Sequence, residues 1–216
     1  NWQPDVANWP RNANLSFLPN PNSPSGTVVE PATVLRLHNA AARGPLVLDE
    51  AYADFADTGD YLRYATEWPN LIVTRTLSKS YSLAGIRFGF AVAAPALVRE
   101  LVKVKDSYNC DVLSLAAATA AIQDQEYFRE VRAKILATRE RLAGALPALG
   151  FEVTPSHSNF LWCRRADRPV KPVYEELKRR KVLVRYMNYD GYDGLRISVG
   201  TDAETDRLLA DLRSIL

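Results

Sequence analysis

The first half of the chain alternates short apolar runs with segments of helical spacing. The apolar runs predict four strands, over residues 15–18, 45–48, 71–74 and 88–93. Apolar positions that recur every three or four residues predict helices over residues 31–43, 61–68 and 95–105. Strands that alternate with helices are typical of a parallel sheet with helices on its faces, so this half is predicted to be α/β.

The pattern changes near residue 125, where a long amphipathic helix is predicted over residues 126–146 because apolar residues fall on one stripe. Thr201 and Glu204 have the spacing of a capping box, which predicts a final helix that ends at residue 216. Between these two helices, short apolar runs predict strands over residues 151–153, 159–163, 182–186 and 195–199, and one segment of helical spacing predicts a helix over 171–181. We therefore expect two domains, an α/β domain over residues 1–125 and a smaller α+β domain over residues 126–216.

Composition narrows the class of protein. The 216 residues are 47% hydrophobic and carry 27 basic and 25 acidic side chains, interleaved and not gathered into a stripe, so no nucleic-acid partner is expected. No apolar run approaches the roughly 18 residues that span a bilayer, and no signal segment is visible, which favours a cytoplasmic protein. The two cysteines are too few for a disulfide framework and suit a reducing compartment. With only two histidines, a protein metal site is not expected.

The chain opens NWQPDVANWP without an initiator methionine, its single Met being Met187. We therefore expect it to be a fragment of a longer reading frame.

Chemically versatile residues follow two neighbouring strands. Asp49 and Tyr52 come after the strand over 45–48, and Ser78 and Lys79 come after the strand over 71–74. The helix between the strands makes a βαβ unit, whose two strands end at the same edge of the sheet, where ligands bind in open parallel sheets. An acid, a phenol, a hydroxyl and an amine are thus expected to converge.

An anion site is also expected close to Lys79. Arg87 lies eight residues after Lys79, beyond Ala84 and Gly85, whose small side chains let the backbone approach an anion closely. A guanidinium fork suits a phosphate group. Each residue also has an ordinary interpretation: Lys79 as a solvated surface residue, Arg87 as half of a surface salt bridge, Asp49 as a loop carboxylate. Tyr52 is bulky enough to be a core residue instead.

Three segments, LDEAY, TLSKSYSLAGIRFGF and NPNSPSG, resemble the pyridoxal-phosphate (PLP)-dependent aminotransferases of fold type I, and most closely the histidinol-phosphate aminotransferases. The resemblance runs through essentially the whole chain and covers roughly the last two thirds of a family member. It implies part of a mostly parallel PLP-binding large domain, followed by a smaller α+β domain. It also implies a homodimer in the full-length form.

The resemblance implies transamination of an amino acid or an amino-alcohol phosphate of the histidinol-phosphate type, with 2-oxoglutarate as the amino acceptor. Two alternatives stay open. One is a threonine-phosphate decarboxylase on the same scaffold, which would share Lys79 and Asp49, because the choice of reaction on PLP depends on which bond the pocket aligns with the ring. The other is a non-catalytic module with the same fold.

The resemblance also implies roles for single residues. Lys79 would bind PLP covalently and then act as the general base, Asp49 would pair with the pyridine nitrogen, and Tyr52 would donate to the phenolic oxygen of the ring. Ser78 and Arg87 would bind the phosphate group.

Further contacts are implied in and beyond the NPNSPSG turn. That turn has Ser23 where the commoner motif has Asn, so either Ser23 contacts the phenolic oxygen through water or Asn22 contributes; alternatively it is simply a proline-rich turn. Arg196, in LRISVGT, would bind the substrate carboxylate or an equivalent anion. Arg185, in VLVRYMN, matches a second anion-binding arginine, with an exposed arginine at a strand end as the alternative.

The resemblance implies that a preceding segment of a family member supplies the helix terminus that binds the phosphate, the aromatic residue that stacks on the ring, and an arm used in dimers. We therefore expect the 216-residue chain by itself to lack transaminase activity, to bind PLP poorly and to associate with another chain through exposed apolar surface.

Overall fold

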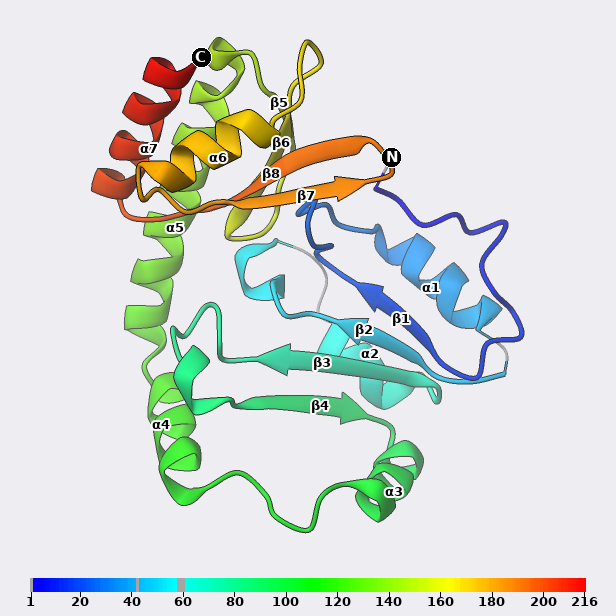
Figure 1. Cartoon of the computed structure of the whole chain (residues 1–216). Coiled ribbons are helices and arrows are strands. Elements are labelled where there is room, and N and C mark those ends of the chain that lie inside the picture. Colours follow the sequence, from blue (N-terminus) through cyan, green and yellow to red (C-terminus); the bar gives the residue numbers. More distant parts are fainter. Residues whose placement is uncertain (1, 42, 58–60) are drawn as a thin grey trace. The chain divides into compact units, whose positions relative to one another are not determined.

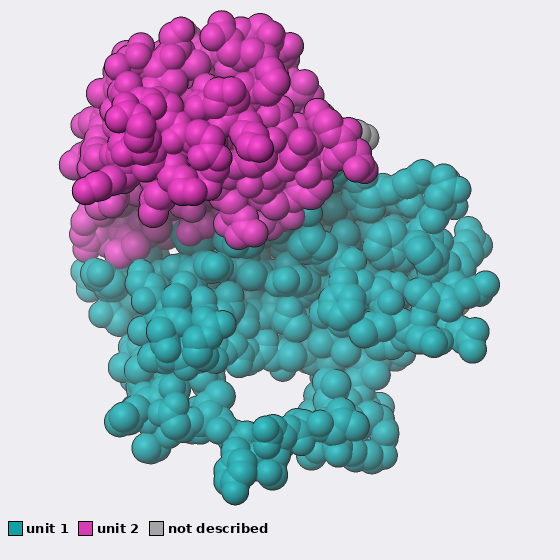
Figure 2. Space-filling model, in the orientation of Figure 1, with its two compact units in different colours: residues 1–22, 28–129 teal, residues 23–27, 130–216 magenta. Residues whose placement is uncertain are grey.

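The computed structural model describes residues 2–41, 43–57 and 61–216. The chain forms two compact units, residues 1–22 with 28–129 and residues 23–27 with 130–216 (Figure 2). The first unit therefore holds the predicted βαβ motif, and the second holds the carboxyl-terminal α+β region together with a short piece of the NPNSPSG turn.

The first unit is built on a four-stranded sheet in the order β1-β2-β3-β4 (Figure 1). Strands β1, β2 and β3 are parallel, whereas β4 runs antiparallel to β3. A loop and not a crossover helix joins β3 to β4, which allows the antiparallel pairing. The predicted mostly parallel α/β sheet is confirmed, with these bounds: β1 Ser16–Pro19, β2 Leu46–Asp49, β3 Leu71–Thr76 and β4 Gly89–Ala93.

The helices of this unit follow the predicted order, with one addition. The predicted helix over 31–43 ends at Ala40, and residue 42 lies outside the described residues. An unpredicted helix, α4, runs through VLSLAAATAAIQ, where alanines surround the axis and leave no polar stripe to mark a period. The helices are α1 Pro31–Ala40, α2 Tyr61–Glu67, α3 Pro95–Val104 and α4 Val112–Gln123, with short 3-10 turns η1 Ala53–Phe55 and η2 Ala84–Ile86.

The two faces of this sheet are covered unequally. Leucines and valines of β1, β2 and β3 pack against Val34 and Leu37 of α1 and Tyr61 of α2 in the main core of the unit. The opposite face carries a small buried cluster of Val47, Ile72 and Ala93 with Leu97 of α3 packed against it. On β1, Phe17 is 63% exposed. Apolar surface therefore remains open on the described part of this unit.

The second unit has an antiparallel sheet in the order β5-β6-β8-β7. The carboxyl-terminal part of α5 and the helices α6 and α7 supply apolar residues to one core with this sheet, including Leu142, Leu177 and Leu209. The elements are α5 Gln125–Ala145, η3 Pro147–Leu149, β5 Glu152–Thr154, β6 Phe160–Arg164, α6 Lys171–Arg179, β7 Arg185–Tyr189, β8 Tyr192–Ser198 and α7 Asp202–Ile215.

The bounds predicted for one strand of this unit are wrong. The strand expected over 182–186 begins only at Arg185 and continues to Tyr189, where it turns into β8. Asp190 and Gly191 form the turn, and both have positive φ, 50° and 86°. An Asp-Gly pair is a strong hairpin signal, because two-residue hairpin turns need positive φ. The segment NYDGYDG thus closes the hairpin between β7 and β8.

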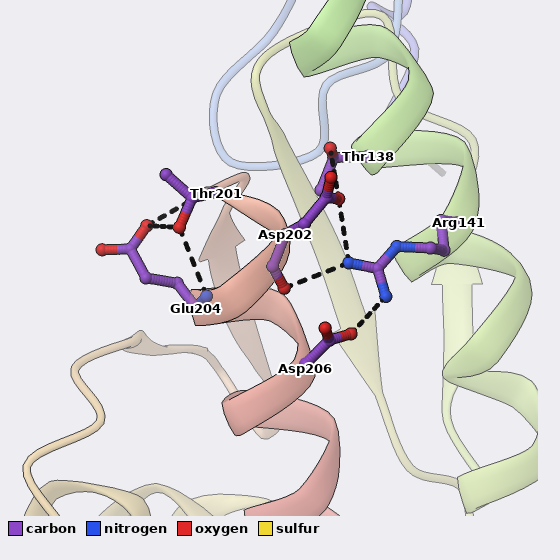
Figure 3. Close-up of polar contacts among 6 residues, drawn as sticks. All are labelled: Thr138, Arg141, Thr201, Asp202, Glu204 and Asp206. Atoms are coloured by element: carbon purple, nitrogen blue, oxygen red, sulfur yellow. Dashed lines mark hydrogen bonds and ion pairs between the residues drawn. The ribbon is translucent and has the colours of Figure 1, made fainter.

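The predicted capping box at the start of α7 is confirmed (Figure 3). Thr201 Oγ1 accepts a hydrogen bond from the Glu204 amide at 3.3 Å, and Glu204 Oε2 accepts one from the Thr201 amide at 2.8 Å. Arg141 of α5 forms ion pairs with Asp202 and Asp206 in the first turns of α7. These contacts fix the start of α7 on α5, and they thereby hold the carboxyl end of β8, the strand that carries Arg196.

Candidate active site

The carboxyl ends of three parallel strands lie in register. Asp49, the last residue of β2, pairs with Pro19 of β1 and with Thr74 of β3. Two backbone hydrogen bonds continue the ladder beyond it, from Asn20 N to Asp49 O and from Glu50 N to Thr74 O, each 2.9 Å long. The segments that leave these strands therefore emerge at one edge of the sheet, as the βαβ pattern predicts.

The structure brings Lys79 and Tyr52 together at this edge. Lys79 Nζ lies over the ring of Tyr52, 5.5 Å from its centroid, within the range of a cation–π contact. Tyr52 is half-buried and precedes η1, whereas Lys79 is exposed in the segment after β3. The amine is therefore accessible to a ligand and lies beside a phenol.

Asp49 shapes the turn that presents Tyr52. Its Oδ1 atom accepts a hydrogen bond from the amide of Ala51 at 3.0 Å, so one carboxylate oxygen holds the start of the loop. This local bond is typical of an Asp that stabilises a turn. The side chain is nevertheless exposed, and a carboxylate can accept several hydrogen bonds, so it can also pair with a ligand.

Ser78 and Arg87 flank Lys79 along the chain. The Ser78 hydroxyl accepts a hydrogen bond from Thr76 Oγ1 at 3.0 Å, and Arg87 Nη1 donates to the Ala84 carbonyl at 2.8 Å. Arg87 has a left-handed backbone (φ 56°, ψ 36°), which costs a residue with a side chain about 1 kcal/mol. Such strain is concentrated at ligand-binding positions. A Cβ added at Gly85 would meet no atom within 4 Å, so the chain leaves space there.

The two candidate anion-binding arginines are cross-strand neighbours in the second unit. Arg185 of β7 pairs directly with Arg196 of β8. Side chains at directly opposed positions lie on the same face of a sheet, and two like charges there repel each other. An anion bound between them would relieve this repulsion. Apolar periodicity does not give this register, but the Asp190–Gly191 turn is the sequence signal that could have predicted the pairing.

Arg196 is held by two further contacts within its unit. Its Nη1 atom donates to Ser23 Oγ at 2.9 Å, and its guanidinium lies 5.0 Å from the ring centroid of Phe160. The Nε atom of Arg196 is buried and has no hydrogen-bond partner among the described residues. The guanidinium thus retains donor capacity for a ligand.

The NPNSPSG turn places Ser23 beside Arg196. Gly26 has φ +74°, and a Cβ there would lie 2.1 Å from Ser156 Oγ, so only glycine fits. The Gly26 carbonyl accepts a hydrogen bond from the His157 amide at 2.8 Å. The cofactor contacts predicted for Asn22 and Ser23 remain predictions; the observed partner of Ser23 is an arginine 173 positions away, which no local pattern signals.

The described residues give no support to two other kinds of site. In the ranges 2–41, 43–57 and 61–216, no three His, Cys, Asp or Glu side chains are grouped so that they could hold a metal ion. Burial raises the pKa of the Cys163 thiol, which removes it as a nucleophile.

None of the helices in those ranges has both the length and the apolar character that crossing a membrane requires.

Comparison with known proteins places this arrangement in a family. Residues 4–212 match the family model of class I and II aminotransferases. A histidinol-phosphate aminotransferase of Rhodopirellula baltica is 54% identical over 193 residues, which cover 89% of this chain and 53% of that protein. The chain therefore spans about half the length of this relative.

Solved structures agree with this similarity. The crystal structure of a histidinol-phosphate aminotransferase from Sinorhizobium meliloti in complex with pyridoxal 5'-phosphate superposes with a TM-score of 0.87 at 30% identity, covering 95% of this chain and 59% of that one. An L-threonine-O-3-phosphate decarboxylase from Porphyromonas gingivalis gives a TM-score of 0.79 at 23% identity, covering 95% and 68%. At that identity the second likeness shows a shared fold alone.

Proposed function

The chain belongs to the class I and II aminotransferases, and from this premise we propose that the protein containing it is a PLP-dependent aminotransferase of the histidinol-phosphate type. The proposed reaction moves an amino group from an amino acid or amino-alcohol phosphate to 2-oxoglutarate. The observation that carries the proposal is the placement of Lys79 over Tyr52 at the sheet edge where Asp49 ends β2. This arrangement occurs in a chain that is 54% identical to a histidinol-phosphate aminotransferase.

The residues at the sheet edge fit PLP chemically. PLP, when bound, supplies an electron sink for the bond that is broken at the amino-bearing carbon. Lys79 would bind the cofactor covalently and move the proton at that carbon, and Asp49 would hold a proton on the ring nitrogen. Tyr52 would donate to the phenolic oxygen of the ring, with Asn22 or Ser23 as further partners.

The phosphate group would be bound by Ser78 and Arg87. The Ser78 hydroxyl already lies in a network with Thr76. The Arg87 guanidinium donates to the carbonyl of Ala84, next to Gly85, where an added Cβ would meet no atom within 4 Å. A hydroxyl and a guanidinium together suit a phosphate dianion.

The paired arginines support an anionic substrate. Arg185 and Arg196 face each other across β7 and β8, and Arg196 retains a buried donor. A phosphate or a carboxylate offers the several acceptors that two guanidinium groups require. We propose that these arginines bind the phosphate of the amino donor and a carboxylate of the acceptor in alternate half-reactions.

Replacing Arg196 with glutamine is expected to raise the KM for both substrates by roughly 10-fold or more, because a hydrogen bond to a charged group contributes about 1.5–3 kcal/mol. Replacing Arg185 should affect the phosphorylated donor more than 2-oxoglutarate, because Arg185 is the second member of the pair. The thermal unfolding temperature of the unliganded Arg185→Gln variant should not fall, since a like-charge contact is removed. Steady-state kinetics with each substrate and thermal melts provide the measurements.

The matched control for the arginine variants is Arg168→Gln, which removes an exposed arginine that pairs with Asp167 in the same unit. This control should leave both KM values unchanged. An Arg196→Gln variant that is equally indistinguishable from wild type would contradict the anion-binding role.

One assay of the full-length protein discriminates between the proposed reaction and its alternative. The enzyme is incubated with histidinol phosphate, aromatic amino acids or O-phosphothreonine while 2-oxoglutarate consumption and CO₂ release are followed. Consumption of 2-oxoglutarate with histidinol phosphate and no CO₂ release supports the transaminase. Release of CO₂ from O-phosphothreonine would show that the protein is the decarboxylase and not the transaminase. If the protein is inactive and binds no PLP, the non-catalytic module is the remaining alternative.

We also propose that the full-length protein is a cytoplasmic homodimer. The first unit exposes large apolar side chains on and around α3 and α4, among them Val104 at 80% and Leu113 at 77%. Exposed apolar surface of this kind marks a protein contact.

Two free thiols, Cys110 and Cys163, agree with a reducing compartment.

The 216-residue chain by itself is expected to bind PLP weakly and to show no turnover. Asp49, Lys79 and Arg87 are all exposed, so a ligand there would be contacted from one side only, and the apolar surface around α3 and α4 should drive self-association. Titration with PLP and light scattering after size exclusion measure both effects. Micromolar binding with turnover in a monodisperse monomer would contradict the expectation.

A further inference from the structure

One charged residue next to the candidate active site in the chain is buried. Glu50 follows Asp49 in the chain, and its residue is only 1% exposed. Arg75 of β3 reaches it with two nitrogens, since Nε and Nη2 each lie 2.7 Å from Glu50 Oε2. Burial and the charge of Glu50 raise the pKa of the neighbouring Tyr61 to about 12, so that phenol stays neutral. A buried carboxylate requires a paired cation, and Arg75 supplies it.

The same guanidinium extends to a second loop. Arg75 Nη1 lies 2.9 Å from Asp54 Oδ1, and the other oxygen of Asp54 accepts a hydrogen bond from the hydroxyl of Ser80. Ser80 is buried, and the Arg75 side chain is 18% exposed. Four side chains, those of Glu50, Asp54, Arg75 and Ser80, thus form one continuous network, which we call the Arg75 cluster.

The positions of the cluster members in the sequence give the network its significance. Glu50 is adjacent to Asp49, Asp54 lies two residues beyond Tyr52, and Ser80 is adjacent to Lys79. The cluster therefore joins the segment after β2, which carries the acid and the phenol, to the segment after β3, which carries the amine. Lys79 itself is exposed and has a flexible side chain, so its position over Tyr52 depends on how these two segments are held.

We propose that the Arg75 cluster is a positioning device that sets the spacing between the Lys79 amine and the Tyr52 phenol. The inference rests on the proposed function, in which both groups act on the cofactor. An error of about 1 Å in such a constellation is enough to lower a rate roughly 100-fold. The cluster residues contact no substrate; they act through the two segments that they connect.

Ser80→Ala is the most direct test, because it removes one hydroxyl and leaves the Arg75 ion pairs intact. In the full-length protein, kcat should fall roughly 10-fold, the factor that corresponds to losing a hydrogen bond to a charged group, while the KM for 2-oxoglutarate stays within about twofold. The visible circular dichroism of bound PLP should change, because it reports the orientation of the ring. Ser80→Thr, which restores the hydroxyl, should recover both.

A second readout needs neither cofactor nor turnover. In the PLP-free protein, the rate at which an amine-specific acetylating reagent modifies Lys79 is measured by mass spectrometry relative to Lys103, an exposed lysine of α3. Ser80→Ala and Arg75→Met should each raise the relative rate several-fold, because the amine loses its fixed position over the Tyr52 ring. Arg63→Met, which breaks an exposed ion pair with Glu67 on α2, is the matched control and should change nothing.

The outcomes separate this inference from the proposed function. The positioning role would be overturned if the Ser80→Ala variant had the same kcat, dichroism and Lys79 labelling rate as the wild type. It would also be overturned if activity fell only in proportion to a loss of thermal stability. A wild-type protein that neither binds PLP nor turns over would overturn the proposed function. The labelling ratio would then still decide whether the cluster positions Lys79.

Discussion

Lys79→Ala in the full-length protein is expected to abolish covalent attachment of PLP and, with it, all transamination. The amine is the group that would form the covalent bond, and the Tyr52 ring beneath it offers no nucleophile of comparable strength. The absorbance band near roughly 410–430 nm that is typical of lysine-bound PLP should be absent. Borohydride reduction followed by peptide mass spectrometry should find the cofactor mass on the peptide containing Lys79 in wild type and on no peptide in the variant.

Lys103→Ala is the control for this experiment. Lys103 is an exposed lysine in the same unit and forms an ion pair with Glu100 at 2.7 Å on α3, so its loss removes a similar side chain far from the strand ends. The control should keep the band, the reduced adduct and the activity. A band that persists in Lys79→Ala, with the adduct on another lysine, would show that the assignment is wrong.

The sequence predicts the strand-end part of the site well, and the physical reason is local. Asp49 ends one apolar strand and Lys79 follows the next, and the helix-containing crossover between the strands allows the parallel pairing that brings their ends together. Nothing beyond the order of elements is needed to place them at one edge. The convergence of Asp49, Tyr52 and Lys79 therefore depends on features that a periodicity analysis detects.

The remaining contacts of the site depend on information that periodicity does not contain. Ser23 meets Arg196 only because the NPNSPSG turn packs against the loop that carries Ser156 and His157. The Arg185–Arg196 pairing depends on the register of a hairpin, which the Asp-Gly turn sets and apolar periodicity does not. The position of the Asp190–Gly191 turn fixes which side chain opposes Arg196.

The Arg75 cluster was missed for a different reason. Each of its residues has an ordinary local interpretation, Glu50 and Asp54 as loop carboxylates and Arg75 as a polar residue near a strand end. Their importance comes from burial, and the exposure of a charged residue cannot be deduced from one sequence. The exposed groups of the candidate site can therefore be identified from sequence motifs, whereas the buried groups of the Arg75 cluster can be identified only from the three-dimensional structure.

Asp49→Asn is expected to lower turnover much more than it lowers cofactor affinity. Asparagine nearly conserves the shape of the side chain and keeps an oxygen for the hydrogen bond from the Ala51 amide, so the turn should survive. What is lost is the negative charge that would keep the pyridine nitrogen protonated. Removing a charged partner of a reacting group costs about 3 kcal/mol or more, which corresponds to a loss of more than roughly 100-fold in kcat.

The chain offers a close match for this experiment in Asp106. Its Oδ1 atom accepts a hydrogen bond from the Tyr108 amide, two residues on, just as Asp49 Oδ1 accepts from Ala51. Both aspartates are exposed and lie in the same unit, so Asp106→Asn makes the same chemical change in the same local motif away from the strand ends. Measurements of kcat, the dissociation constant for PLP and the unfolding temperature on both variants isolate the role of the charge. If Asp49→Asn and Asp106→Asn both transaminate at near-normal rates, the carboxylate of Asp49 serves only to hold its turn.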